Sequence, residues 1–115
     1  MKRMSMLPAF VCALACARPE PEEPEYRGQS YREALATMCD ADRLARLENE
    51  ADPLEKGQKR EDWLNERIEN PEAIYFRTLL KVQGPAEKSA SLRSEAKASG
   101  LPTCRLAETI ATEGL

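Results

Sequence analysis

The hydrophobic residues from Ser30 onward recur with the period of an α-helix. Apolar side chains stand three and four residues apart, as at Tyr31, Leu35 and Met38. No segment shows the strict alternation or the β-branched runs that indicate a strand. The pattern therefore predicts an all-α domain, a small irregular bundle of four to five short helices.

Local signals place the ends of these helices. Ser30 and Glu33 have the spacing of a capping box, which starts a helix expected to run to about Leu47. Two further starts place a capping side chain directly before a proline, at Asp52-Pro53 and Asn70-Pro71. The predicted helices after Leu47 are one turn from Pro53 interrupted at Gly57, then 58–69, 73–82, 85–99 and a short segment from Pro102.

The few large apolar side chains are assigned to the core. Apolar residues cover more than half of the circumference of the segment 73–82, which is therefore expected to be the most buried helix. Trp63, Tyr75 and Phe76 are interpreted as core residues rather than as the walls of an apolar pocket. Arg67 stands four residues after Trp63, where its guanidinium can stack on the indole ring. At the end of 85–99, Gly100 is expected to terminate the helix with a Schellman motif.

Composition narrows the chemistry. The chain has 115 residues, enough for one domain, and contains no histidine. It therefore lacks the commonest general base and metal ligand, and no enzymatic activity or cofactor is expected. Ser94 and Lys97 match the S-x-x-K motif of penicillin-binding proteins, but the chain is far too short for that fold. The pair is interpreted as part of a solvated helix face.

Charge and carboxylate spacing exclude two further classes of site. The net charge of −3 offers no basic surface to nucleic acid. Asp40 and Asp42, two positions apart in a predicted helix, point in different directions, so no metal site is expected. The mixed charges of 59–69 indicate an exposed, salt-bridged face, with a charged docking surface as the alternative.

The N-terminus has the layout of a secretory signal. Lys2 and Arg3 precede an uncharged, mostly apolar run from Met4 to Ala15. A membrane-spanning helix needs roughly 20 apolar residues, so this run is too short to span a bilayer stably. The sequence Ala-Leu-Ala-Cys at 13–16 resembles the lipobox of bacterial lipoproteins, with its first two positions exchanged relative to the preferred order.

That resemblance implies a lipid anchor. In bacterial lipoproteins the signal is cut before the cysteine, whose thiol receives a diacylglyceryl group and whose new amino group is acylated, often with palmitate. Cys16 is the matching position, which makes 1–15 the signal peptide. Ala17, standing where an aspartate is the inner-membrane signal, favours the outer membrane by the same resemblance. The alternative is an ordinary signal peptide cut after Ala15, which would leave a soluble secreted protein.

A charged, proline-rich linker follows the cysteine. Prolines at 19, 21 and 24 alternate with glutamates at 20, 22, 23 and 25. Proline favours extended polyproline II and like charges repel, so we expect 16–29 to be the lipidated cysteine and a disordered acidic tether. The helical domain is then expected to occupy 30–115.

Two cysteines remain in that domain. Cys12 leaves with the signal and Cys16 carries lipid, so Cys39 and Cys104 form a pair in an oxidising compartment. We expect a disulfide between them, joining the first helix to the last. The alternative of a redox-active pair lacks the C-x-x-C spacing that lowers a thiol pKa.

The sequence as a whole predicts a membrane-anchored envelope lipoprotein with a non-catalytic binding, accessory or structural role. It is similar in build to small helical lipoproteins of Gram-negative bacteria. The expected partners are the membrane, through the lipid, and an envelope protein. The alternative is a secreted enzyme or ligand carrier that has no recognisable motif.

Overall fold

A computed structural model describes residues 27–114, and this part of the chain is all-helical, with six helices and no strand. The fold class predicted from the sequence is therefore confirmed. The helices are α2 (Tyr31–Cys39), α3 (Ala41–Leu44), α4 (Pro53–Arg67), α5 (Pro71–Leu80), α6 (Pro85–Ala98) and α7 (Arg105–Glu113). Cys16, the predicted signal peptide and most of the predicted tether lie outside the described residues.

The first predicted helix is wrong in its length. Its capping box is present, because the Ser30 hydroxyl accepts the Glu33 amide and the Glu33 carboxylate accepts the Ser30 amide. The helix does not continue to Leu47, however: α2 ends at Cys39, and α3 begins after Asp40. Cys39 is tied to the last helix and α3 carries ion-pair contacts to α4, and neither constraint is visible in the local pattern.

Helix α4 corrects a second prediction. It runs without interruption through Gly57, so the expected break after one turn is absent. Glycine costs a helix only about 1 kcal/mol relative to alanine, and its neighbours in α4 offset that cost. Lys56 and Arg60, one on each side of Gly57, both pair with Asp42 of α3.

Most other predicted helix ends are confirmed to within two residues, but the last helix begins at Arg105 rather than at Pro102. The Asp52 carboxylate accepts the Leu54 amide at the start of α4, and the Asn70 side chain accepts the Ala73 amide at the start of α5. After α6, the amides of Gly100 and Leu101 donate to the carbonyls of the last turn, which is a Schellman ending. Gly100 has φ of +80°, a conformation that a side chain would strain.

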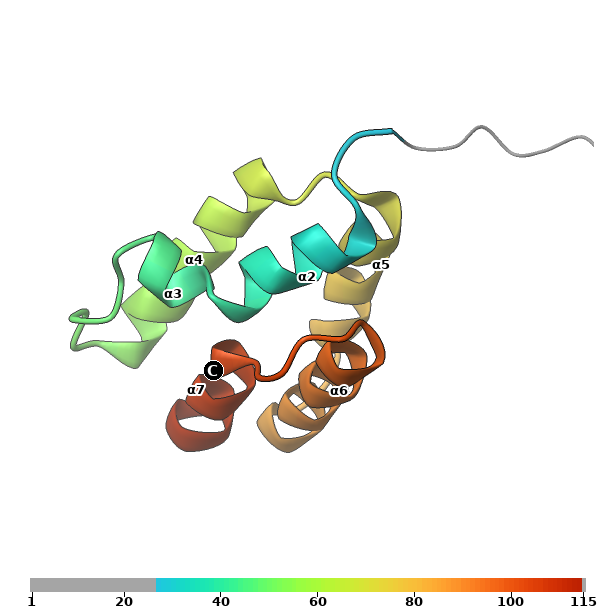
Figure 1. Cartoon of the computed structure of the whole chain (residues 1–115). Coiled ribbons are helices and arrows are strands. Elements are labelled where there is room, and N and C mark those ends of the chain that lie inside the picture. The colour runs from blue at the N-terminus through green and yellow to red at the C-terminus, as the bar shows by residue number, and fades with distance from the viewer. Residues whose placement is uncertain (1–26, 115) are drawn as a thin grey trace, which may run out of the picture.

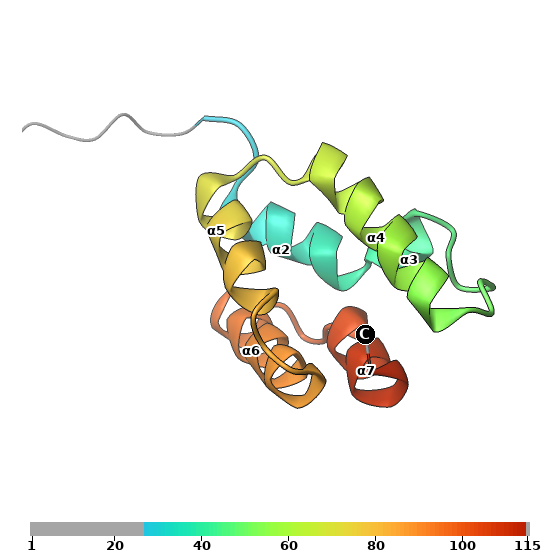
Figure 2. The ribbon, with the colours of Figure 1, turned by 180° about the vertical axis from the view of Figure 1, so that it is seen from behind.

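Helix α2 crosses the middle of the bundle (Figure 1). Helices α3 and α4 lie at one end of it and α5 at the other, while α6 and α7 lie side by side beneath it (Figures 1 and 2). The core between them is built from small and aliphatic residues, with Ala34, Leu35 and Leu92 fully buried at its centre. Alanine supplies a third of the buried core cluster, at positions 34, 41, 73, 96 and 107, so the core contains few large side chains.

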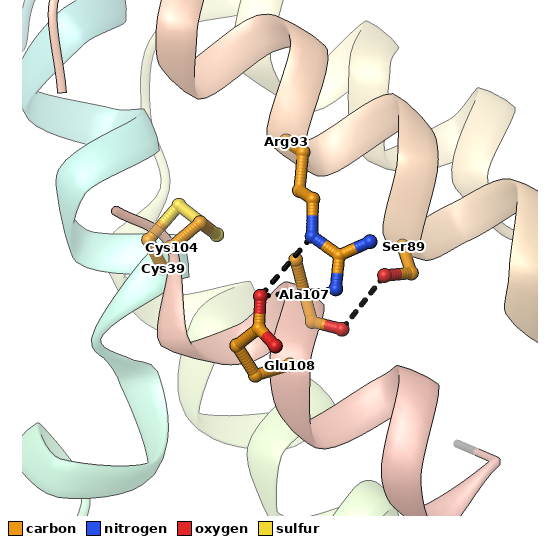
Figure 3. The surroundings of a disulfide bond; sticks show 6 residues. All are labelled: Cys39, Ser89, Arg93, Cys104, Ala107 and Glu108. Carbon is orange, nitrogen blue, oxygen red and sulfur yellow. Dashed lines mark hydrogen bonds and ion pairs between the residues drawn. A yellow bond between two sulfur atoms is a disulfide. The ribbon is translucent and has the colours of Figure 1, made fainter. Parts of the chain in front are cut away.

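The predicted disulfide is present and joins α2 to the start of α7. The Cα atoms of Cys39 and Cys104 lie 4.6 Å apart, and both residues are buried. Nearby, the buried Ser89 hydroxyl donates to the Ala107 carbonyl at 2.8 Å, which links α6 to α7 (Figure 3). One covalent bond and one buried hydrogen bond therefore tie α7 to α2 and α6, in addition to its ion pairs and apolar packing.

The segment just before α2 is fixed to the domain by Gln29. Its side-chain carbonyl accepts the backbone amides of Glu69 and Asn70, and its amide group donates to the Arg67 carbonyl. The Asn70 side chain donates to the Gln29 carbonyl in return. The chain therefore enters the domain beside the connection between α4 and α5 (Figure 1). Among the described helices, none is long and apolar enough to cross a membrane.

Candidate functional site

A groove of about 310 Å³ lies between α4, α5, α6 and α7. Figure 2 shows the arrangement of these four helices. The floor consists of buried aliphatic and thioether side chains: Met38, Leu64, Leu80, Leu92, Leu106 and Ile110. At the mouth stands Leu54, which is 73% exposed. The volume is at the lower end of the range for small-molecule sites, about 300–1,000 Å³.

The walls of the groove carry four cations, two of which are neutralised within the domain. The Arg77 guanidinium, buried in the wall, donates to Glu61 at 2.6 Å and to Asn65 at 3.1 Å. Arg60 forms a two-pronged ion pair with Asp42, at 2.7 and 2.9 Å. These two arginines therefore build the wall and hold α4 against α5 and α3.

The other two cations are Lys81 and Lys88. Neither ammonium group forms an ion pair or a hydrogen bond with a described residue. Lys81 follows the last residue of α5 and Lys88 lies in the first turns of α6, so they stand on the two sides of one short turn. The groove thus has a cationic end at the α5–α6 turn and an apolar floor leading away from it.

The residues singled out in the sequence lie elsewhere. Cys39 and Cys104 form the disulfide and do not line the groove. Asp40 forms an ion pair with Arg43 at the protein surface, and Asp42 forms one with Arg60 of α4. No group of three metal-ligating side chains occurs within residues 27–114. Cys16, the predicted lipid attachment site, is outside the described range.

Helix α5 is not the most buried helix, which corrects the expectation from its composition. Ile74 and Leu79 are more than 40% exposed, Tyr75 is 65% exposed, and Val82 just after the helix is 84% exposed. Within the helix only Ala73, Arg77 and Leu80 are buried. Tyr75 is therefore a surface residue rather than a core residue.

The other aromatic residues of the described chain, Tyr31, Trp63 and Phe76, are partly buried against the core. The Arg67 guanidinium lies 4.3 Å from the centre of the Trp63 indole ring. The Tyr31 hydroxyl donates a short hydrogen bond to Glu95 on α6. Burial, followed by this bond and the charge of Glu95, raises the pKa of Tyr31 above its ordinary value.

Sequence reasoning missed the groove, although one signal for it was present. Neither Lys81 nor Lys88 has an acidic residue three or four positions away on either side. Six of the eleven other cations of 30–115 share this absence, so the signal is weak, whereas Lys59, for example, has Glu55 four residues before it. A lysine without a local partner is not itself a site, and only the packing of four helices places these two beside an apolar floor.

Comparisons with protein families, curated proteins and solved structures found no match to this chain. The class of the protein therefore rests on its fold and its groove: a small, disulfide-closed helical domain with a cationic and apolar cleft.

Proposed function

We propose that this protein is a lipid-anchored component of the bacterial envelope whose helical domain acts by binding. Its binding site is the groove between α4, α5, α6 and α7. The observation that carries the binding role is the pairing of an apolar floor with two lysines that form no ion pair within residues 27–114. Concave, mostly apolar sites with a few placed polar groups are the usual form of ligand sites in proteins. The lipobox-like segment ending at Cys16 supports the anchoring role.

The position of the tether is compatible with an accessible groove. Gln29 fixes the tether beside the start of α5, whereas Lys81 follows the end of that helix. Ten helical residues separate these two points, which is about 15 Å along the axis. The cationic end of the groove therefore lies at the opposite end of α5 from the chain that leads to the membrane.

The anchor is tested by the intact mass of the protein purified from bacterial membranes, with a Cys16→Ala variant as control. A chain that begins at Cys16 and carries added acyl mass is the expected result, and the variant should lose that mass. An unmodified chain cut after Ala15 would instead support the soluble ligand carrier. A full-length chain in the cytosol would contradict both.

The binding role is tested on the same preparation by native mass spectrometry. Wild-type protein is expected to retain a small molecule that dissociates under collisional activation. A Gly57→Leu variant introduces a side chain on the groove wall in a residue type that favours a helix, so it should fold and lose the molecule. Equal retention by both proteins would place the binding site elsewhere.

A further inference from the structure

We infer that the groove binds a single-chain amphipathic anion, with the anionic head at Lys81 and Lys88 and the hydrocarbon chain on the apolar floor. This inference rests on the proposed function, because it names the class of ligand for the same groove. It follows from three properties of the groove: the chemistry of its floor, the balance of its charges and its size.

The floor selects for hydrocarbon. The side chains of Leu64, Leu92 and Ile110 offer no polar atom, so a polar group lying on them would lose its hydration without gaining a hydrogen bond. An alkyl chain that binds there is removed from water, and this burial of apolar surface is favourable. The part of the ligand that lies deepest is therefore apolar.

The charge balance selects for an anion. Of the charged groups that line the groove, Arg77 and Glu61 neutralise each other, and Arg60 is paired with Asp42 behind the wall. The charge left over is that of Lys81 and Lys88, two positive groups in a protein whose net charge is −3. A lysine ammonium group acts as a compact point charge on a flexible stem, so two of them can close on one small anionic head.

The size selects for one chain. A volume of about 310 Å³ is at the lower limit for small-molecule sites, so it suits one extended chain better than the paired chains of a phospholipid. Leu54, exposed at the mouth, is placed to cover a chain once it is bound. Carboxylate and phosphate heads share the chemistry that the lysines recognise.

The test is isothermal titration calorimetry with full-length protein carrying Cys16→Ser, which has no acyl chain to compete. The probes are dodecanoate, dodecyl phosphate, dodecanol and dodecyltrimethylammonium, each below its aggregation concentration. We expect the two anions to bind and the alcohol and the cation to bind about tenfold more weakly or worse, since a charge-assisted hydrogen bond contributes that much. The order of dodecanoate and dodecyl phosphate distinguishes the two head groups.

Variants test the binding of the anionic head and the binding of the hydrocarbon chain separately. The double variant Lys81→Gln, Lys88→Gln should weaken dodecanoate by about tenfold or more and leave dodecanol unchanged. The matched control Lys59→Gln, Lys97→Gln removes the same charge from outside the groove and should bind as wild type. Gly57→Leu should weaken every probe. Helix content measured by circular dichroism confirms that each variant is folded.

Different failures have different meanings. If dodecanol or the cation binds as tightly as dodecanoate, or if the double lysine variant binds dodecanoate as wild type does, the inference about the anion is refuted while the groove remains a binding site. If none of the four probes binds, and native mass spectrometry also finds no molecule that Gly57→Leu removes, the proposed function fails as well.

Discussion

Substituting Asp42 tests the ion cluster that joins three helices. The Asp42 side chain is only 13% exposed, and it accepts two hydrogen bonds from Arg60, whose side chain is 4% exposed. The Lys56 ammonium group lies 3.8 Å from the same carboxylate and 3.1 Å from Glu113 on α7. Asp42→Ala takes this carboxylate away from two cations that stay buried.

The expected cost is large relative to the stability of a small domain. Breaking a buried ion pair from one side costs about 3–5 kcal/mol, because the remaining charge stays desolvated. Lys56 keeps Glu113 as a partner, so the lower figure applies here. Domains of this size lose about 4 °C or more in melting temperature per kcal/mol, which gives a fall of at least about 12 °C out of a total stability of about 5–15 kcal/mol.

The assay is thermal unfolding followed by circular dichroism, with two comparisons. Glu108→Ala breaks the exposed pair with Arg93 and should lower the free energy of unfolding by about 1 kcal/mol at most. Asp42→Leu combined with Arg60→Met removes both charges and should recover most of the loss. If Asp42→Ala melts within a few degrees of Glu108→Ala, the cluster is not buried as described and the reasoning is refuted.

Four further predictions concern the disulfide, the N-cap of α5, the Tyr31 hydroxyl and the exposed Val82. Cys39→Ser should destabilise the domain by about 4 kcal/mol in urea unfolding, because it opens a loop of 65 residue steps, and should leave the proposed acylation of Cys16 unchanged. Asn70→Ala should cost about 1 kcal/mol by the same assay, as the cap of α5 is lost. Stability should fall as the pH rises above about 10, because the unfolded chain releases the phenolic proton that folded Tyr31 retains, and Tyr31→Phe should flatten this fall. Val82→Ser should leave the melting temperature nearly unchanged, since the side chain is 84% exposed, and a clear loss would show that the end of α5 is covered.

The sequence by itself determined the helical class, most helix ends and the disulfide. The caps at Ser30 and Asn70 and the glycine ending at Gly100 depend on atoms within a few residues, so their signals are complete in the local sequence. The disulfide was found by counting, since only Cys39 and Cys104 remain in the domain.

Only the tertiary structure decided the break after Cys39, the continuity of α4 through Gly57 and the exposure of α5. Each depends on contacts between residues far apart in the chain, such as Asp42 with Arg60, that outweigh local preference by a few kcal/mol. The groove is the extreme case. Its floor draws on five helices, and Lys81 and Lys88 become a cationic end only because folding leaves them beside that floor without an ion pair to any described carboxylate.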